Sequence, residues 1–310
     1  MSFTVIDVTP DTPEWEQERR NSIGASELAA AMNLSPYATP LDVWKHKQGV
    51  DRPFDELLSF IGHESEHIIE RWVERFSGVH VSLKPAFMAR SIEFPFLHAS
   101  FDRVSDNPFT TWQFKTAHHY TGHKWDDGIP TDIRIQVQGE MLVAGTQRAA
   151  VVVWIGGREF RLFWEDRDER FIREHLIPTA RDMWERVQND DAPPPSTIAE
   201  VNAISTVDRP VELSDTAFET FERIAVLNAD IRAQEEERDA LKVAFAQYVG
   251  SADTLTHNGR KVGTWKQQKG RVGFDREGFT LDHPHLAAQY TRTGAPFRVL
   301  RATKQKEQTQ

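Results

Sequence analysis

The chain has 310 residues, a composition typical of globular proteins and a formal net charge of −10. This charge argues against a general polyanion-coating protein, and the lack of cysteine excludes disulfides, thiolate zinc sites and cysteine-held iron–sulfur clusters. No apolar run reaches membrane-spanning length and the N-terminus lacks a signal-peptide pattern, so we expect a soluble, cytoplasmic protein with no membrane partner.

The first predicted elements are short helices. Residues 15–33 predict a polar turn or short helix followed by a second helix, ELAAAM, for which Ser26 is a good N-cap. A helix N-terminus has free N–H donors, so one interpretation is that Arg19, Ser26 and this helix bind a phosphate. These residues alone favour the other interpretation, an ordinary capped helix with a solvated arginine. Further on, Thr39 is predicted to cap a helix that ends at Gly49.

Residues 62–78 predict an amphipathic helix, because apolar residues recur three and four positions apart and a glycine follows. The helix contains His63, Glu64, Glu66 and His67 in the H-E-x-x-H pattern of zinc peptidases, whose two histidines bind one metal. No third ligand follows at a recognisable spacing, which disfavours a peptidase. Glu66 is alternatively an oxygen ligand of a nuclease site, and a third interpretation is a solvated helix face.

Residues 98–116 carry the pattern that organises the chain. Apolar and polar residues alternate on both sides of a turn at residues 105–108, which predicts neighbouring antiparallel strands. Asp102 would then lie near Gln113 and Lys115, which share one strand face. A carboxylate, a second oxygen ligand and a lysine are the groups that Mg²⁺-dependent phosphodiester hydrolysis needs. The spacing is similar to the Asp…Glu-x-Lys signature of the PD-(D/E)xK nucleases.

The surrounding sequence predicts a mixed α/β domain. Residues 79–89 and 94–104 are predicted strands, with Glu93 between them as a further carboxylate. A loop rich in His, Gly and Asp follows the Gln-x-Lys strand and is long enough to contact a substrate. The later elements are a helix at 131–146 that carries Gln136 and Gln138, a β-hairpin at 149–166 that turns at two glycines, and a long helix at 168–187.

An acidic, proline-rich stretch, NDDAPPPST, begins at residue 189 and predicts a domain boundary. We therefore predict a first domain over residues 1–190, a proline-rich linker over 191–212 and a C-terminal region over 213–310. In the last region, residues 213–249 predict one long helix or a helical hairpin, because their apolar residues fall near heptad spacing. A β-hairpin that turns at Asn258-Gly259 should follow.

The C-terminal region is also the basic part of the chain. Residues 251–310 contain eleven Lys and Arg against five Asp and Glu, a balance of +6, which leaves −16 for residues 1–250. Any nucleic-acid contact is therefore expected in a cleft or in this basic tail. Trp265 and the basic residues around it form either a patch that stacks on bases and binds phosphates or a packing contact with the long helix.

Five stretches together resemble the YqaJ-type viral recombinase family, a lambda exonuclease-like branch of the PD-(D/E)xK nucleases. They occur in one order over about residues 13–190: WEQERR to LDVW, GHESE, HASFD, WQFKTA and IQVQGEMLV. The resemblance implies a restriction-endonuclease-like α/β fold, with a mixed central sheet flanked by helices. It also implies 5′-to-3′ digestion of double-stranded DNA ends with Mg²⁺, or Mn²⁺ as substitute. The implied partners are a single-strand annealing protein, which uses the 3′ strands, and further copies of the chain in a homotrimer.

The resemblance also implies site residues. Asp102 matches the metal-binding aspartate, and Lys115 matches the lysine that assists the attacking water. Glu66 matches the glutamate on the preceding helix. Gln136 matches the first glutamine of a Q-x-Q helix near the site. The residues that match those gripping the 5′ phosphate are Arg19 and Ser26.

Gln113 departs from the family pattern, which has Glu at this position. A neutral amide keeps an oxygen donor for the metal but removes a negative charge on which Mg²⁺ relies. Either a natural variant works less well or uses Glu93 or Glu66 in compensation, or a deliberate Glu→Gln change traps an inactive complex. In both cases we predict weak or absent cleavage with the site geometry intact. The main alternative function is a non-catalytic DNA-end-binding or scaffolding protein.

Overall fold

The protein is described by a computed structural model that covers residues 2–10, 12–50, 55–106, 108–204 and 210–301. The chain forms two compact units, Met1–Val201 and Asn202–Gln310, each of which is described by itself. The division between them falls inside the stretch that the sequence predicts as a linker. Within the described ranges, no helix is long and apolar enough to cross a membrane.

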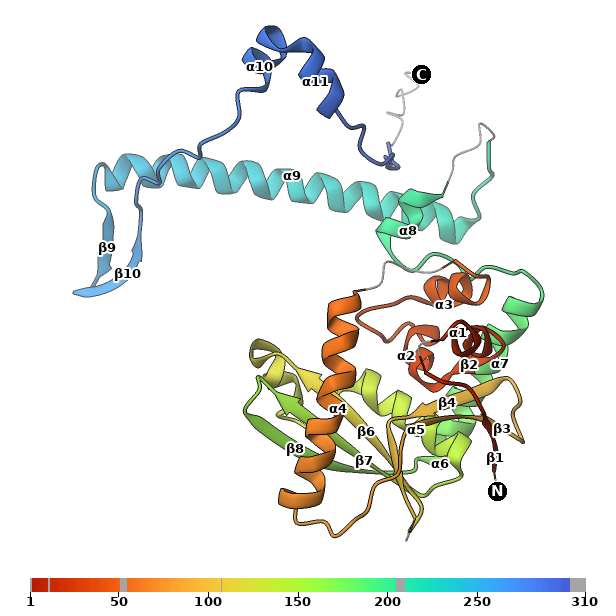
Figure 1. The fold of residues 1–310 in the computed structure, drawn as a ribbon. Coiled ribbons are helices and arrows are strands. Elements are labelled where there is room, and N and C mark those ends of the chain that lie inside the picture. The colour runs from red at the N-terminus through yellow and green to blue at the C-terminus, as the bar shows by residue number, and fades with distance from the viewer. Residues whose placement is uncertain (1, 11, 51–54, 107, 205–209, 302–310) are drawn as a thin grey trace. The chain divides into compact units, whose positions relative to one another are not determined.

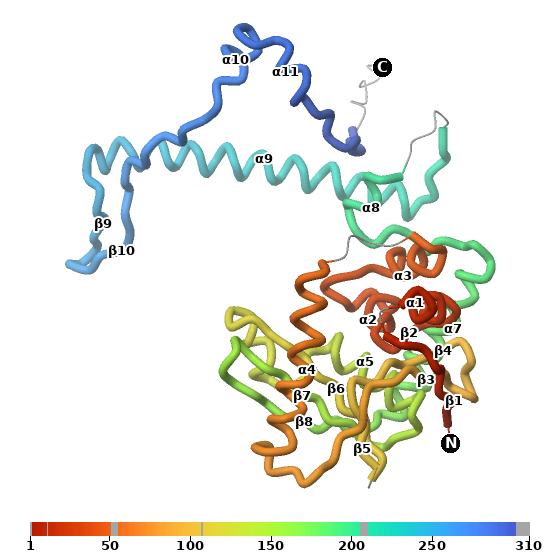
Figure 2. The backbone as a smooth tube through the Cα atoms, in the orientation of Figure 1, coloured from red at the N-terminus to blue at the C-terminus, as the bar shows by residue number. Residues whose placement is uncertain are grey.

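The first unit contains two four-stranded sheets. Figures 1 and 2 show the course of the chain through them. The first sheet has the order β1-β3-β4-β2, in which β2 is parallel to β4 and the other pairs are antiparallel. Its strands are β1 (Phe3–Ile6), β2 (Ile23–Gly24), β3 (Phe87–Ser91) and β4 (Leu97–Phe101). The chain leaves this sheet at Asp102, the single residue between β4 and the next strand.

The second sheet has the order β5-β6-β7-β8, with β6 parallel to β7 and the other pairs antiparallel. Its strands are β5 (Arg103–Ser105), β6 (Thr110–Ala117), β7 (Arg148–Ile155) and β8 (Glu159–Asp166). β7 is apolar on both faces because both are covered. The predicted β7–β8 hairpin is confirmed, and its two glycines have the positive φ values that a tight turn requires, 57° and 73°.

The helices of the first unit cover these sheets. They are α1 (Pro13–Arg20), η1 (Ala25–Glu27), α2 (Leu28–Ala31), α3 (Pro40–Lys47), α4 (Glu56–Phe76), η2 (His119–Trp125), α5 (Thr131–Ala144), α6 (Glu169–Phe171), η3 (Ile172–Leu176) and α7 (Ile177–Gln188). A further helix, α8 (Ile198–Ala203), spans the division between the two units. The predicted cap of α3 is confirmed, since Thr39 accepts a hydrogen bond from the Asp42 amide and Gly49 follows the helix with φ 83°.

The two faces of the second sheet bury different helices. The helix α4 runs across the second sheet (Figure 1). Its Ile69 and Val73 pack on one face against Trp112 and Phe114 of β6. The opposite face of β7 packs against α5 and the end of η2, through Val137, Met141 and Trp125. Other residues of α5, with α2, α7 and the first sheet, form the largest core. α5 thus connects both sheets, and the expected α/β fold with mixed sheets flanked by helices is confirmed.

Three local predictions are wrong. The strand expected at residues 79–89 begins only at Phe87, because the preceding residues make no strand beyond an isolated bridge between Lys84 and Val104. The strand expected at residues 94–104 is split at Asp102 into β4 and β5, and only β5 pairs with β6. The polar loop after β6 is largely the 3-10 helix η2.

The second unit consists of α9 (Asp215–Val249), β9 (Thr254–His257), β10 (Arg260–Thr264), α10 (Arg276–Asp282) and α11 (Pro284–Tyr290). Of the two alternatives for its first segment, the structure has one continuous helix of 35 residues. The β-hairpin turns at Asn258-Gly259 as predicted. Trp265 packs edge-on against Phe245 of α9, with ring centroids 5.4 Å apart, which favours the packing interpretation of this tryptophan.

Candidate active site

The alternation of β6 places two polar side chains against α5. Trp112 and Phe114 pack on the α4 side, so Gln113 and Lys115 project from the other face of the strand. Lys115 Nζ donates to Gln136 Oε1 on α5 at 3.2 Å, and Gln136 Nε2 donates to Gln113 Oε1 at 3.0 Å. The structure therefore joins Gln113, Lys115 and Gln136 in one network between β6 and α5.

Asp102 joins this network at the edge of β6. The pairing of β5 with β6 begins at Arg103 opposite Trp112, which leaves the next part of the β6 edge open to a side chain. Asp102 Oδ2 accepts hydrogen bonds from Gln113 Nε2 at 2.5 Å and from the Phe114 amide at 2.7 Å. Burial raises the pKa of Asp102, and the charge of Lys115 opposes this rise.

Glu66 lies close to Asp102 but is held by an arginine that the sequence analysis missed. Arg103 Nη1 is 3.1 Å from Glu66 Oε2, and its Nη2 is 3.1 Å from Glu70 Oε2. Burial, and next the charge of Asp102, raises the pKa of Glu66 to about 7, while Arg103 opposes this. Arg103 follows Asp102 directly in the sequence, but only the packing of α4 shows that it pairs with these two carboxylates.

Glu140 is a second residue that the sequence analysis missed. It lies one helical turn after Gln136 on α5, and its Oε1 accepts a hydrogen bond from Gln136 Nε2 at 2.8 Å. Glu140 is buried. Burial, and next the charge of Asp102, raises the pKa of Glu140 to about 8. The spacing of four residues from Gln136 was the available signal, although it does not show that this face of α5 turns toward β6.

Of two further candidate sets, Glu93 lies apart from the network, whereas His63 and His67 lie beside it. Glu93 is exposed in the turn before β4, at the opposite end of that strand from Asp102, so the suggested compensation by Glu93 does not fit the structure. His63 and His67 line a cavity of about 500 Å³ together with Glu66 and Asp102. His67 lies 3.8 Å from Glu70, and its side chain is 68 % exposed.

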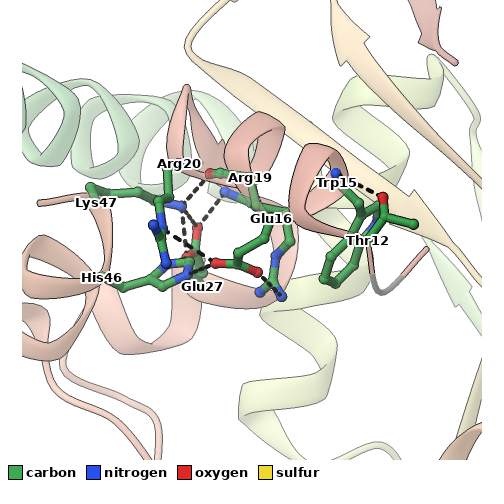
Figure 3. Close-up of polar contacts among 9 residues, drawn as sticks. Thr12, Trp15, Glu16, Arg19, Arg20, Glu27, His46 and Lys47 are labelled. Atoms are coloured by element: carbon green, nitrogen blue, oxygen red, sulfur yellow. Dashed lines mark hydrogen bonds and ion pairs between the residues drawn. The ribbon is translucent and has the colours of Figure 1, made fainter. Parts of the chain in front are cut away.

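The candidate phosphate-binding residues lie around α1 and η1. Ser26 is exposed inside η1 and does not cap the following helix, because Gly24 and Glu27 hold the N-cap positions of η1 and α2. Arg19 lies in the last turn of α1, where its guanidinium carbon is 4.6 Å from the centre of the Trp15 ring and its Nη1 is 3.7 Å from Glu16 Oε2 (Figure 3). Both candidates therefore remain accessible.

A buried ion pair fixes this region, and the sequence analysis missed it. Lys47 Nζ donates to Glu27 Oε1 at 2.7 Å and to the Arg19 carbonyl oxygen at 2.7 Å, while His46 Nδ1 lies 3.0 Å from Glu27 Oε1 (Figure 3). Burial works against ionisation of Glu27, but the charge of Lys47 and the hydrogen bond from His46 hold the pKa of Glu27 below its ordinary value. These contacts connect α1, η1 and α3.

One cavity joins the network to the phosphate candidates. It has a volume of about 810 Å³, and its lining includes Arg19, Ser26, Lys115 and Gln136. The helix η2 also contributes to the wall through Lys124 and Trp125. A polyanionic ligand in this cavity would therefore meet cationic side chains from three different elements.

The residues of the network fit Mg²⁺ by donor type. Asp102, Gln113 and Glu66 offer the oxygen atoms that this ion prefers. Among the residues that the structure describes, no three His, Cys, Asp or Glu side chains are gathered closely enough to hold a metal ion. These three candidate ligands are all hard oxygen donors. Because Gln113 is neutral, the strand pair has one acidic side chain fewer than the Asp…Glu-x-Lys signature contains.

Solved structures similar to this chain include exonucleases. An alkaline exonuclease from Laribacter hongkongensis is 16% identical, with a TM-score of 0.49 over 58% of this chain and 94% of that chain, and the same values hold for its complex with dAMP. A phage-related exonuclease from Haemophilus somnus is 13% identical, with a TM-score of 0.43 over 55% of this chain and 96% of that chain. The comparison with curated proteins gives no match.

The fold and the network together define a class of protein. It is a mixed α/β protein in which an aspartate, two glutamines and a lysine form hydrogen bonds beside a cavity lined by cationic side chains. A family model, the YqaJ-like viral recombinase domain, matches residues 14–147. This match agrees with the family resemblance that the sequence motifs predicted for this part of the chain. The matched segment contains all seven residues that the resemblance singles out, from Arg19 to Gln136.

Proposed function

We propose that this protein is a viral recombination nuclease that digests double-stranded DNA ends from 5′ to 3′ with Mg²⁺. The 3′ single strands that remain would serve a single-strand annealing protein. The observation that carries the proposal is the network of Asp102, Gln113, Lys115 and Gln136 at one side of a cavity that Arg19 and Ser26 also line. The match to the family model supports the same reaction and a homo-oligomer, for which a trimer is the first expectation.

The side chains of the network have complementary tasks in this proposal. Lys115 orients the attacking water as an ammonium or deprotonates it as a neutral amine, and the ammonium form also offsets charge on the phosphate, while Gln136 holds the side chain in place. Asp102, Gln113 and Glu66 are the residues that would hold Mg²⁺. The ion supplies a Lewis acid for the phosphate and activates water. Arg19 and Ser26 grip the terminal 5′ phosphate and so restrict the reaction to ends.

Gln113 weakens this centre. Its amide donates a hydrogen bond to Asp102, whereas a glutamate there would add a negative charge for the metal. We therefore expect slow or absent cleavage by the chain as it stands and recovery in the Gln113→Glu variant. The experiment is digestion of linear duplex DNA labelled at the 5′ or the 3′ end, with release of labelled mononucleotides as the readout. Early release of only the 5′ label by Gln113→Glu supports the proposal, and turnover of the unchanged chain at a normal nuclease rate contradicts the predicted block.

The hydrogen bond between Gln113 and Asp102 also favours a second candidate function. It satisfies Asp102 without a cation, as a protein that binds DNA ends and has lost its chemistry would require. Gel-shift titrations with end-labelled duplexes and closed circular DNA distinguish the two functions. Tight, end-specific binding by both forms with cleavage by neither supports the scaffolding function, and cleavage by Gln113→Glu rules it out.

A further inference from the structure

Glu140 occupies a costly position for a carboxylate. It is 1 % exposed on the buried face of α5, between Val137, Met141 and Val143, which are fully buried apolar residues. Its hydrogen-bond partner, Gln136, is a neutral amide, and burial of a carboxylate without a bonded cation is strongly unfavourable. Packing alone favours an apolar residue here, so this carboxylate needs an explanation outside the core.

The contacts of Glu140 lead directly to the network at Gln113. The Gln136 amide group has two N–H donors, and they reach Gln113 Oε1 at 3.0 Å and Glu140 Oε1 at 2.8 Å. The remaining acceptor of this side chain, Oε1, takes the hydrogen bond from Lys115 Nζ. Glu140 and Lys115 therefore fix the orientation of the Gln136 amide together, because Glu140 Oε1 accepts from its N–H end and the lysine donates to its oxygen.

The distribution of charge around the network also supports a role for Glu140 in the site. The signature of this centre has two acidic residues on the strand pair, but here Gln113 supplies a neutral amide beside Asp102. Glu140 lies near enough for Asp102 and Lys115 to act on its charge. A bound divalent cation would favour the ionised form of Glu140, and α5 would then carry the negative charge that is absent from β6, one hydrogen-bonded side chain away from Gln113.

We propose that Glu140 is a positioning residue of the metal centre, which orients Gln136 and supplies the negative charge that Gln113 lacks. Asp102 and Glu140 then balance one divalent cation together, with Gln136 as the link between Glu140 and the remaining ligands. The inference rests on the proposed function for the identity of the centre, because it assigns the charge to a metal-dependent nuclease site.

The test is Mn²⁺ binding to the full chain, measured by titration calorimetry and by the loss of the free Mn²⁺ resonance in electron paramagnetic spectra. Glu140→Gln should weaken Mn²⁺ binding by about ten-fold or more, the usual effect of removing a residue that supports metal ligands. Gln113→Glu should tighten it. The double variant Gln113→Glu/Glu140→Gln, which moves the charge back to β6, should bind at least as tightly as the unchanged chain. A purely structural role for Glu140 predicts no such rescue.

A matched control is Glu165→Gln. Glu165 accepts from Gln138 Nε2 at 3.1 Å, so this variant removes a carboxylate bonded to the neighbouring glutamine of the same helix, and Mn²⁺ affinity should not change. Gln136→Met keeps Glu140 but removes the amide that connects Glu140 with Gln113, so this variant should also weaken Mn²⁺ binding. It provides a second test if Glu140→Gln fails to fold. Unchanged Mn²⁺ affinity in folded Glu140→Gln or in Gln136→Met overturns the inference, as does a double variant that binds as weakly as Glu140→Gln.

DNA digestion by the same variants keeps the two proposals apart. If the Mn²⁺ affinities follow the expected order but Gln113→Glu never cleaves DNA, the role of Glu140 in metal binding stands and the nuclease proposal falls. If Gln113→Glu cleaves DNA while Glu140→Gln leaves Mn²⁺ affinity unchanged, the nuclease proposal stands and the role of Glu140 is refuted.

Discussion

Lys115 is the residue through which the proposed chemistry is most directly tested. Its ammonium is held by Gln136 at the cavity, so Lys115→Met should remove the proton-handling group while leaving end binding largely intact. On the Gln113→Glu background we expect single-turnover cleavage to fall by about 10²–10⁴-fold. Lys84→Met is the control, because Lys84 pairs with Asp106 at the surface, and its rate should not change. Equal rates for the two variants would exclude the assigned role of Lys115.

His98 gives a prediction about stability at the residue scale. Burial lowers the pKa of His98 from its ordinary value of 6.5 to about 3, and its Nδ1 lies 2.9 Å from Ser22 Oγ. Between these two pH values the unfolded chain binds the proton that the folded chain excludes, so the free energy of unfolding falls as the pH decreases. One fully titrating group contributes about 1.4 kcal/mol per pH unit. Urea unfolding at pH 7 and pH 5 should show a smaller difference in His98→Gln, and an unchanged difference would contradict this assignment.

At the scale of elements, α5 and η1 approach so closely that a side chain at position 139 has no space. A Cβ built on Gly139 would lie 2.5 Å from Leu28 Cδ1 and 3.2 Å from Ala25 Cβ, both in buried residues. Gly139→Val should therefore lower the free energy of unfolding by about 1–3 kcal/mol. Gly62→Ala in α4 is the matched control, because nothing lies within 4 Å of its added Cβ. Thermal unfolding of both variants checks this, and equal midpoints would show that the close contact carries no cost.

The elements also show how far the sequence could predict the site. The alternation in β6 predicted that Gln113 and Lys115 share a face, because period two reports the two faces of a sheet. It could not predict Glu140, since α5 is buried on several sides and its sequence does not mark the face toward β6. Arg103 and Lys47 were missed for a similar reason, because their partners come from helices distant in sequence. Glu93 lies between two strands as predicted, but this connection is at the end of β4 opposite Asp102.

At the scale of the whole molecule, the two units differ in how much they bury. In the described part of the second unit, residues 202–204 and 210–301, no residue is buried, whereas the first unit contains every core cluster found in the described chain. We therefore expect a fragment of residues 1–201 to fold and to unfold near the midpoint of the full chain. Circular dichroism melts compare the two, and a fragment that is unfolded at room temperature would contradict this division.

The roles of the second unit in DNA binding and self-association stay predictions. α9 exposes apolar residues along its length, among them Ile224, Ile231 and Leu241, and the basic residues follow it. We expect that deletion of residues 200–310 weakens DNA binding or changes the oligomer size, because an exposed apolar helix of this length is suited to association. Analytical ultracentrifugation and gel shifts of the deletion and the full chain measure the two effects, and no change in either refutes the prediction.

The most direct test of the central claim is mononucleotide release from 5′-phosphorylated linear duplex DNA by the Gln113→Glu variant in Mg²⁺. The same reaction is run with EDTA and with Asp102→Asn added to the variant. We predict release from the 5′ end that both EDTA and Asp102→Asn abolish, because Asp102 accepts two hydrogen bonds within the network. Release that persists in the Asp102→Asn chain, or no release from Gln113→Glu under any condition, would contradict it.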